Sequence, residues 1–526
     1  MTPRAGVLAA ILILIGGTCM AQPKAPNVVE LSVAQMQAAM TRGRTTSKAL
    51  VAAYLARIKV VDKAGPKLNS VIEVNPDALR IAAEMDAERK AKGPRGPLHG
   101  VPVLIKDNIA TADRMQTTAG SLALVGVKPP RDSAVAAKLR EAGAVILGKT
   151  NLSEWANIRS TRSTSGWSAR GGLTRNPYAL DRNTSGSSSG SGAAIAASLA
   201  AVAVGTETDG SITSPSSANG IVGIKPTLGL VSRAGIIPIA HSQDTAGPMA
   251  RTVADAAALL SALSGSDSHD DATSAADAHA GDFTRYLDKE ALKGARLGVV
   301  RSQFTVARND LVAKELEKAL DVLRAQGAIL VDVAELPGAG KYSQGEFDVL
   351  CYELKADMAT YLAEWAPGAS VRTLADLIDF NERHADTELR WFGQETFLRA
   401  QSKGGLDSPE YIEALASNRR LSREEGIDKA LRDNHLDALI APTGQPAWLT
   451  DFIKGDASGG GFAQAAAVAG YPHVTVPGGY VQGLPVGLSF VGTAWSEPRL
   501  IAIAYAFEQA SKVRRPPKYK KTLNGW

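Results

Sequence analysis

The chain has 526 residues, of which 45% are hydrophobic and 5% aromatic, and its formal net charge is +5. This length allows one large α/β domain or two to three ordinary domains. Arg4 and six basic residues between Lys512 and Lys521 carry seven positive charges, so the rest of the chain is close to −2. The basic character therefore belongs mainly to the tail, which we interpret as a solvated terminus, and no nucleic-acid partner is expected.

The N-terminus has the layout of a signal peptide. Arg4 precedes an apolar run from Ala5 to Ile15, and small residues lead up to Ala21. The run is too short to span a bilayer comfortably. We predict cleavage after Ala21, a periplasmic or secreted mature protein, and no stable membrane insertion once residues 1–21 are removed. Lipidation at Cys19 is the alternative.

Removal of this leader has a consequence for cysteine chemistry. Cys19 leaves with the leader, and Cys351 is then the one remaining cysteine of the sequence. An intramolecular disulfide is therefore excluded even in an oxidising compartment. Stability must come from the hydrophobic core.

The first half of the chain alternates between helical and strand patterns. Apolar residues recur on one face from Leu50 to Ile58, after Thr45-Thr-Ser47, which predicts an amphipathic helix with an N-cap candidate among these hydroxyl residues. Residues 101–105 form an apolar run that predicts a buried strand ending at Lys106. A second helix is predicted from Asp132 to Ala142, followed by a strand over 144–147. This alternation is typical of a layered α/β fold.

The later segments extend the same pattern. An alanine-rich helix is predicted over 193–201 and a short strand over 202–205, which leads toward Ser211. The polar stretch 264–282 is predicted to be a surface insertion, and about 336–432 to be a peripheral helical elaboration. The sequence contains no internal repeat and no convincing domain linker.

Lys106 and two serine motifs carry the strongest chemical signal. Lys106 ends the apolar run Val101–Ile105, so its amine is expected in dry surroundings that disfavour its charged form. A neutral lysine can take the proton of a serine hydroxyl and so activate it as a nucleophile. Candidate serines lie in Thr184-Ser-Gly-Ser-Ser-Ser-Gly-Ser-Gly192 and in Gly205-Thr-Glu-Thr-Asp-Gly-Ser211.

These motifs, together with Gly220-Ile-Val-Gly-Ile-Lys-Pro-Thr227 and Ser242-Gln-Asp-Thr-Ala-Gly-Pro248, resemble the amidase signature family. The resemblance extends from roughly Leu68 to Gly492. Within the family, Gly166-Trp-Ser-Ala-Arg-Gly-Gly172 looks most like the bacterial peptide amidases. The resemblance implies a single large α/β/α layered domain over 22–526 with a central mixed β-sheet, and no cofactor or metal.

The resemblance also implies the roles of individual residues. Ser211 would be the nucleophile, Ser187 would relay its proton, and Lys106 would be the final base. The family has a cis bond at the position of Gly186–Ser187. The oxyanion hole would consist of the backbone N–H groups of Thr208, Asp209, Gly210 and Ser211.

This chain departs from the common family pattern at four positions. Ser185 and Ser189 replace glycines, Asp209 precedes Gly210, and Thr213 stands where an arginine is common. Loss of that arginine argues against substrates with a fixed anionic handle and against a role in tRNA-linked amidotransfer. Asp209 tolerates left-handed backbone geometry and could also contact substrate.

Other chemistries fit the same residues less well. Gly186-Ser-Ser-Ser-Gly190 also matches a nucleophile elbow, with Ser188 as nucleophile, but no strand leads directly into it. The same stretch lacks the Gly-Lys-Ser/Thr ending of a phosphate-binding loop. Histidines and aspartates gather in one polar segment, but their spacing is irregular for a metal site. They are His269, Asp270, Asp271 and His279.

We therefore expect a secreted amide hydrolase that releases ammonia, most simply from the C-terminal carboxamide of a peptide. Hydrolysis of aryl or aliphatic amides or of esters is the nearest alternative. A member of another functional class, an amidase-like binding protein with negligible turnover, is the second. Trp167, Tyr178, Arg170 and Arg175 lie near the serine motifs, but structural roles are at least as plausible for them.

Overall fold

The computed structural model describes residues 26–305, 310–457 and 460–523. The predicted leader, residues 1–21, lies outside the described residues. None of the helices in the described part of the chain combines the length and the apolar character needed to cross a bilayer.

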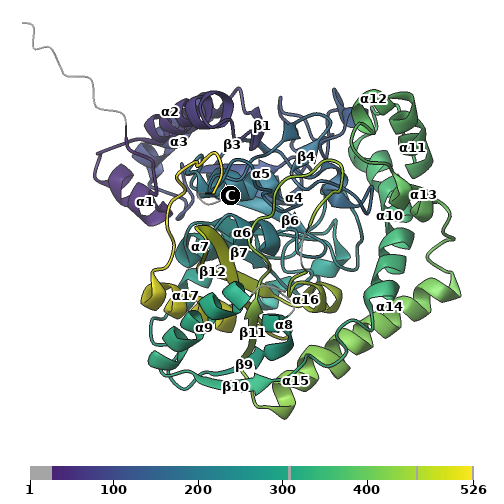
Figure 1. Ribbon diagram of the computed structural model, residues 1–526. Helices are drawn as coiled ribbons and strands as arrows, with labels where there is room; N and C mark the ends of the chain where they lie inside the picture. The colour runs from purple at the N-terminus through teal and green to yellow at the C-terminus, as the bar shows by residue number, and fades with distance from the viewer. Residues whose placement is uncertain (1–25, 306–309, 458–459, 524–526) are drawn as a thin grey trace, which may run out of the picture.

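One mixed sheet of eleven strands forms the centre of the molecule (Figure 1). From edge to edge its strands are β1 (Val71–Val74), β3 (Val145–Thr150), β2 (Pro102–Lys106), β6 (Val202–Glu207), β8 (Thr245–Ala250), β7 (Val222–Lys225), β12 (His473–Val481), β13 (Leu484–Val491), β11 (Ala438–Pro442), β9 (Arg296–Val300) and β10 (Ile329–Val333). Strands β2, β3, β6, β7 and β8 are buried at every position, so both faces of the sheet are covered there. The predicted fold class is confirmed.

Helices from distant parts of the chain cover the sheet. The N-terminal helices are α1 (Val33–Thr41), α2 (Ser47–Arg57), α3 (Ala78–Lys92) and α4 (Ala134–Glu141). Helices α5 (Ser189–Ala196) and α6 (Thr213–Ala218) contact each other and the central strands. In a second group, α17 (Glu497–Ser511) packs against both α7 (Val253–Leu263) and α9 (Asp310–Ala325). Shorter elements are α8 (Arg301–Thr305), α16 (Gln464–Ala469) and the hairpin of β4 (Trp167–Ser168) and β5 (Gly172–Leu173).

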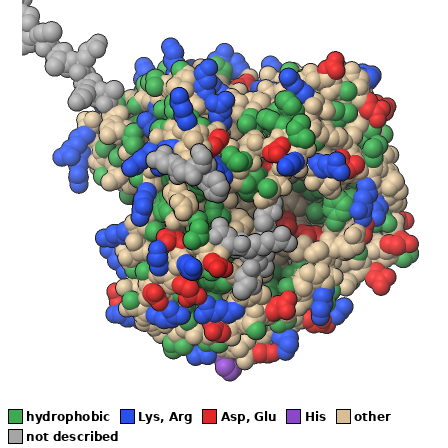
Figure 2. Space-filling model, in the orientation of Figure 1, with side chains coloured by type: hydrophobic (Ala, Val, Ile, Leu, Met, Phe, Trp, Pro, Cys, Tyr) green, Lys and Arg blue, Asp and Glu red, His purple; other side chains and the backbone are tan. Residues whose placement is uncertain are grey.

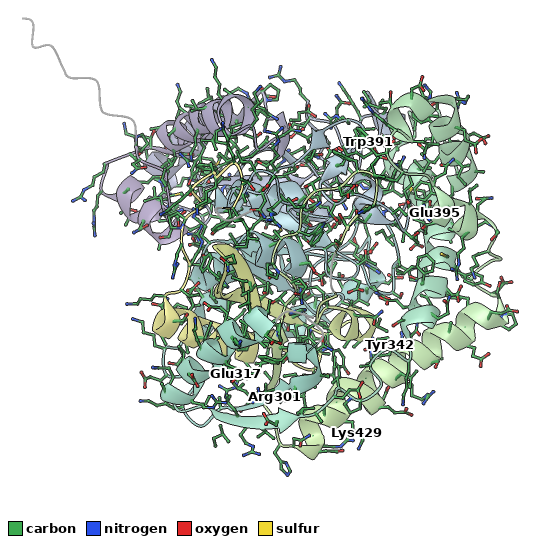
Figure 3. The ribbon with its side chains drawn as sticks, viewed as in Figure 1. Arg301, Glu317, Tyr342, Trp391, Glu395 and Lys429 are labelled. Atoms are coloured by element: carbon green, nitrogen blue, oxygen red, sulfur yellow. The ribbon has the colours of Figure 1, made fainter. Side chains whose placement is uncertain are left out.

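A run of helices lies along one side of the molecule, at the right of Figure 1. It comprises α10 (Ser343–Trp365), α11 (Leu374–Arg383), α12 (Ala385–Glu388), α13 (Glu395–Gln401), α14 (Pro409–Ser422) and α15 (Asp428–Asp433). Polar and aromatic contacts attach it to the rest of the domain (Figure 3): Glu395 accepts a 2.7 Å hydrogen bond from Ser160 Oγ, and Trp391 stacks on Phe452 at 4.4 Å. Buried residues of α10 also share a hydrophobic cluster with Leu152 and Trp155.

Most of the predicted helices and strands are found in the structure, and one helix has shifted boundaries. Strand β2 ends at Lys106, α2 has Thr46 as its N-cap, and α4 has Ser133. Helix α5, predicted over 193–201, instead begins at Ser189 and ends at Ala196. Its N-terminal turn comes so close to a neighbouring segment that a Cβ at Gly190 would overlap the Asn151 backbone. Close packing of small residues thus overrides their weak helix propensity.

Candidate active site

The ends of two adjacent parallel strands bring the predicted site residues together. Strand β2 ends at Lys106, and β6 pairs with it in parallel and leads into the loop that carries Ser211. Carboxyl ends of parallel strands meet at one edge of a sheet. Lys106 Nζ donates hydrogen bonds to Ser187 Oγ at 2.7 Å and to Thr206 Oγ1 at 2.8 Å. The structure therefore places the lysine beside one of the two predicted serines.

Lys106 is fully buried, and burial lowers its pKa from 10.5 to about 7. The carboxylates of Asp244 and Glu207 act in the opposite direction and do not outweigh the loss of solvation. Asp107, its neighbour in sequence, points elsewhere and accepts a hydrogen bond from Arg170 Nη1 at 3.1 Å. Among the described residues no carboxylate forms an ion pair with Lys106, so its neutral form is accessible near neutral pH.

The turn that carries Ser187 is held in a tight environment. The Gly186–Ser187 bond is cis, as the family resemblance implies. A side chain at Gly186 would overlap the Ser153 hydroxyl, so glycine is required there. The neighbouring Ser188 hydroxyl donates to Thr206 O at 3.0 Å and accepts from Thr206 N at 3.2 Å. Because these bonds tie Ser188 to strand β6, the nucleophile-elbow alternative is disfavoured.

The loop from Thr208 to Ser211 has the features of an oxyanion hole. No acceptor for the backbone N–H groups of these four residues is found in the part of the chain that the structure describes. Gly210 provides the positive φ of +77°, so the left-handed position falls on the glycine and not on Asp209. Ser188 N donates to Ser211 O at 3.1 Å and joins the two serine segments. Free N–H groups in a row can stabilise negative charge on a carbonyl oxygen.

A buried carboxylate fixes the far end of this loop. Glu207 Oε2 accepts from Ile212 N at 2.7 Å and from Thr213 N at 2.9 Å, at the start of α6. The Thr213 hydroxyl also lies 3.2 Å from Glu207 Oε2. Thr213 carries no charge, so it provides no cation. It is also fully buried, so its hydroxyl does not face substrate. At the position where an arginine is common in the family, this chain therefore has a threonine that bonds Glu207 and supports the loop.

Gln243 and Asp244 also support this loop, and the sequence alone did not reveal their roles. Thr208 Oγ1 donates to Asp244 Oδ1 at 2.5 Å, and Gln243 Nε2 donates to Thr208 O at 3.2 Å. Burial raises the pKa of Asp244 to about 6, against the hydrogen bonds that it accepts. Both residues lie in the motif 242–248, whose resemblance to the family is the signal that could have pointed to them.

A cavity of about 380 Å³ opens beside the loop. The residues on its wall include Asn157, Gly186, Asp209, Gly210, Trp448 and Gln464. The face drawn in Figure 2 is hollowed near its centre, with acidic side chains visible inside the hollow. No lysine or arginine is among the described residues that line the cavity, which therefore has an acidic character.

Nearby aromatic and basic residues have structural roles. Trp167 is buried and packs edge-on against Phe392 at 5.3 Å. Tyr178 OH donates to Arg515 O at 2.6 Å. Arg170 forms ion pairs with Asp107 and Glu73. Leaving these residues out of the predicted site is consistent with the structure.

The candidate metal ligands in residues 269–279 do not form a site. Asp270 pairs with Arg233, and His279 stacks on Trp495 at 4.2 Å. His269 lies 3.2 Å from Asp267, so three of the four candidate side chains have other partners.

A different group has potential ligand atoms within 4.8 Å of one another: His241, Glu353 and Asp357. These three side chains lie close together because they bond one another and neighbouring protein groups. His241 Nδ1 lies 2.9 Å from Asp357 Oδ2, and Glu353 accepts from Tyr411 OH at 2.8 Å and from Ser242 N at 2.9 Å. The hydrogen bond to Asp357 raises the pKa of His241.

Comparison with known proteins agrees with this geometry. The model of the Amidase family matches residues 49–501. The structure of native peptide amidase from Stenotrophomonas maltophilia superposes with a TM-score of 0.89 at 53% identity, covering 93% of this chain and 99% of that one. A probable amidase of Arabidopsis thaliana is 43% identical over 94% of this chain and 92% of its own length.

A relative with lower sequence identity also matches nearly the whole chain. A glutamyl-tRNA(Gln) amidotransferase subunit of Thermoanaerobacter pseudethanolicus is 34% identical over 94% of this chain and 99% of its own length. These similarities extend over nearly the whole chain, as does the matching arrangement of strands and helices. The chain is an amide hydrolase and belongs to the amidase signature family.

Proposed function

We propose that this protein hydrolyses the C-terminal carboxamide of peptides to the free acid and ammonia, through an acyl-serine intermediate on Ser211. The observation that carries the proposal is the 2.7 Å contact between Ser187 Oγ and a fully buried Lys106 with a pKa of about 7. A serine needs a base to become a nucleophile at neutral pH, and this lysine has the properties of one.

During acylation, protons pass along Ser211, Ser187 and Lys106, first toward the lysine and then back to the leaving group. The Ser211 hydroxyl attacks the carboxamide carbon while its proton passes to Ser187 Oγ and the Ser187 proton passes to neutral Lys106. The carbonyl oxygen becomes an oxyanion, which the free N–H groups of Thr208 to Ser211 stabilise. Collapse of this intermediate breaks the C–N bond, and the proton returns through Ser187 to the leaving nitrogen. Ammonia departs and an ester on Ser211 remains.

Deacylation repeats these steps with water as the nucleophile. Water attacks the ester carbonyl and gives a proton, through Ser187, to Lys106. The Ser211 oxygen leaves and takes that proton back, which yields the free acid and the original enzyme. Atoms and protons balance without any cofactor.

Two observations support a peptide substrate. The superposed structure at 53% identity is named a peptide amidase, and its similarity covers nearly the whole chain. The cavity of about 380 Å³ is large enough for an amino-acid residue beside the scissile amide. The buried Thr213 supplies no cation for an anionic handle of the kind expected in tRNA-linked substrates. Other amides, or esters, are the nearest alternative substrates.

We also propose export by the leader in residues 1–21, with a periplasmic or secreted mature protein. The support is the sequence pattern alone: a basic residue, an apolar run and small residues before Ala21.

A panel of peptide amides, simple amides and the matching methyl esters tests the function, with ammonia release measured for the amides and methanol release for the esters. We expect the peptide amides to be turned over and Ser211→Ala to abolish turnover. Exclusive hydrolysis of simple amides or esters would favour the alternative substrate class. Absence of turnover with every compound would favour an amidase-like binding protein.

Labelling with a serine-reactive phosphonate identifies the nucleophile directly. Mass spectrometry of the digested protein should find the label on Ser211. Ser188→Ala is the matched control, since Ser188 lies in the neighbouring motif and is hydrogen-bonded to the strand; it should still be labelled at Ser211. A label on Ser188 would contradict the proposed triad.

A further inference from the structure

Asp209 differs from the other acidic groups around the cavity. Its residue is exposed although it belongs to the loop next to Ser211, and it lines the cavity wall. No hydrogen bond or ion pair to its carboxylate occurs within the part of the chain that the structure describes. The carboxylate therefore faces the cavity, and no partner for it is found among the described residues.

The other carboxylates nearby are already satisfied by protein donors. Asp456, which also lines the cavity, accepts from Ser165 N at 3.1 Å and from Trp448 Nε1 at 3.3 Å. Glu346, which is 4% exposed, accepts from Gln243 Nε2 at 2.9 Å and from Gln464 Nε2 at 2.7 Å. Neither group can donate to Asp209 when it is ionised.

Solvent reaches Asp209 from the cavity that it lines, but protein surrounds it on its other sides, so an ionised carboxylate without a donor is disfavoured there. Desolvation by the surrounding protein, and then the charges of Glu346 and Glu207, raise the pKa of Asp209 well above its usual value, while Lys225 acts weakly in the opposite direction. A donor brought by the substrate would relieve this cost and hold the ionised form.

The position in the chain restricts which donor can reach it. Asp209 is two residues from Ser211, so its backbone lies within roughly 7 Å of the nucleophile's backbone. The substrate groups nearest the scissile carbonyl are its oxygen, the leaving NH₂ and the substituents on the α-carbon. The oxygen is directed to the oxyanion loop and the leaving nitrogen to Ser187. The substituent on the α-carbon is the one left for Asp209.

We infer that Asp209 is a specificity-determining residue whose carboxylate accepts a hydrogen bond from an N–H group on the α-carbon of the substrate. Either a peptide N–H or the ammonium group of a free amino-acid amide can supply this donor. The inference rests on the proposed function and names the substrate feature that separates peptide amides from simple alkyl and aryl amides.

Three substrates of similar size test it: N-acetylphenylalaninamide with a neutral N–H, phenylalaninamide with an ammonium group, and 3-phenylpropanamide with neither. In the wild type we expect kcat/KM for the better of the first two to exceed that for 3-phenylpropanamide by about tenfold or more. In Asp209→Ala, which removes both accepting oxygens, that ratio should fall toward one, mainly through KM. The better of the two donors identifies the source of the N–H group.

Asp456→Ala is the matched control, because it removes a carboxylate from the same cavity wall that is already bonded to protein. It should change kcat/KM for all three substrates in parallel. A ratio that is the same in the wild type and in Asp209→Ala would overturn the inference and leave the proposed function intact. A parallel loss on all substrates in Asp209→Ala would also overturn it, because that pattern indicates a contact with the leaving NH₂ or a merely structural role.

Labelling rates keep the test independent of amide turnover. Two phosphonates, one with an acetamido group and one with an ammonium group on the carbon next to phosphorus, are compared with their alkyl analogue. The phosphonate with the preferred donor should label Ser211 faster than the alkyl analogue, and Asp209→Ala should remove the difference. If no amide is hydrolysed, the proposed function fails, while this comparison still decides whether Asp209 selects an N–H donor. Equal labelling rates for all three phosphonates in the wild type would overturn the inference.

Discussion

Replacement of Lys106 by methionine tests both the chemistry of the site and its physical basis. Methionine keeps most of the side-chain volume but removes the amine. The fall of the Lys106 pKa from 10.5 to about 7 corresponds to a cost of about 5 kcal/mol for the charged form in the folded protein. This cost arises from burial, so it should appear in the stability of the protein as well as in its activity.

The direction in which pH changes the free energy of unfolding follows from the number of protons that each state binds. In the unfolded chain the lysine stays protonated up to about pH 10.4, whereas in the folded protein it loses its proton near pH 7. Between these values the unfolded state binds up to one more proton, so wild-type stability falls by up to about 1.4 kcal/mol for each pH unit of acidification. Lys106→Met lacks this contribution. The stability difference between the two proteins should change by about 2 kcal/mol between about pH 9 and about pH 7, to the relative benefit of the variant.

Urea unfolding of both proteins at these two pH values measures the difference, and comparison cancels the titration of other groups. Activity in the wild type should rise as pH increases through about 7 and then level off, and Lys106→Met should lose at least about 100-fold in kcat. Lys149→Met is the control: burial lowers the pKa of Lys149 to about 8, but its amine bonds Thr117 and not a catalytic serine. Its stability difference from the wild type should change in the same direction but less, by about 1.3 kcal/mol over the same pH range, and it should retain far more turnover.

Two results would refute this reasoning. Near-wild-type turnover in a folded Lys106→Met protein would exclude Lys106 as the base. A stability difference that does not change with pH would exclude burial as the cause of a lowered pKa.

Three further predictions follow from other parts of the molecule. Thr208→Val should lower kcat more than it changes KM, because it removes the 2.5 Å hydrogen bond that holds the oxyanion loop on Asp244; steady-state kinetics on a peptide amide would contradict this if kcat were unchanged. Arg170→Met should destabilise the protein by about 3 kcal/mol in urea unfolding, because the buried Asp107 would lose its cation. A loss below about 0.5 kcal/mol would show that the ion pair contributes little. If the leader is cleaved as predicted, N-terminal mass spectrometry of protein from the native host should find a mature chain that begins near Gln22. An intact Met1 would exclude cleavage, and a lipid-modified peptide would indicate processing at Cys19.

Several features could be predicted from the sequence because they depend on local patterns. The apolar run Val101–Ile105 indicates a buried strand, and its last residue in the structure is Lys106. The N-caps Thr46 and Ser133 follow from hydroxyl residues that precede a helical apolar pattern. The predicted start of α5 is four residues too late, because serine and glycine indicate a loop unless close packing requires small side chains.

The sequence by itself determined which chemical groups are available: a lysine after an apolar run, two serine motifs and a leader-like N-terminus. The tertiary structure alone decided how they are arranged. The contact of Lys106 with Ser187 joins residues 81 positions apart, and Gln243 bonds to Glu346 across 103 positions. Ser188 and Ser187 are alike in sequence, yet only the pairing of β2 with β6 directs one to the lysine and the other to the strand backbone. Local periodicity reports which face of an element is buried, whereas the partner on that face depends on the order of strands in the sheet.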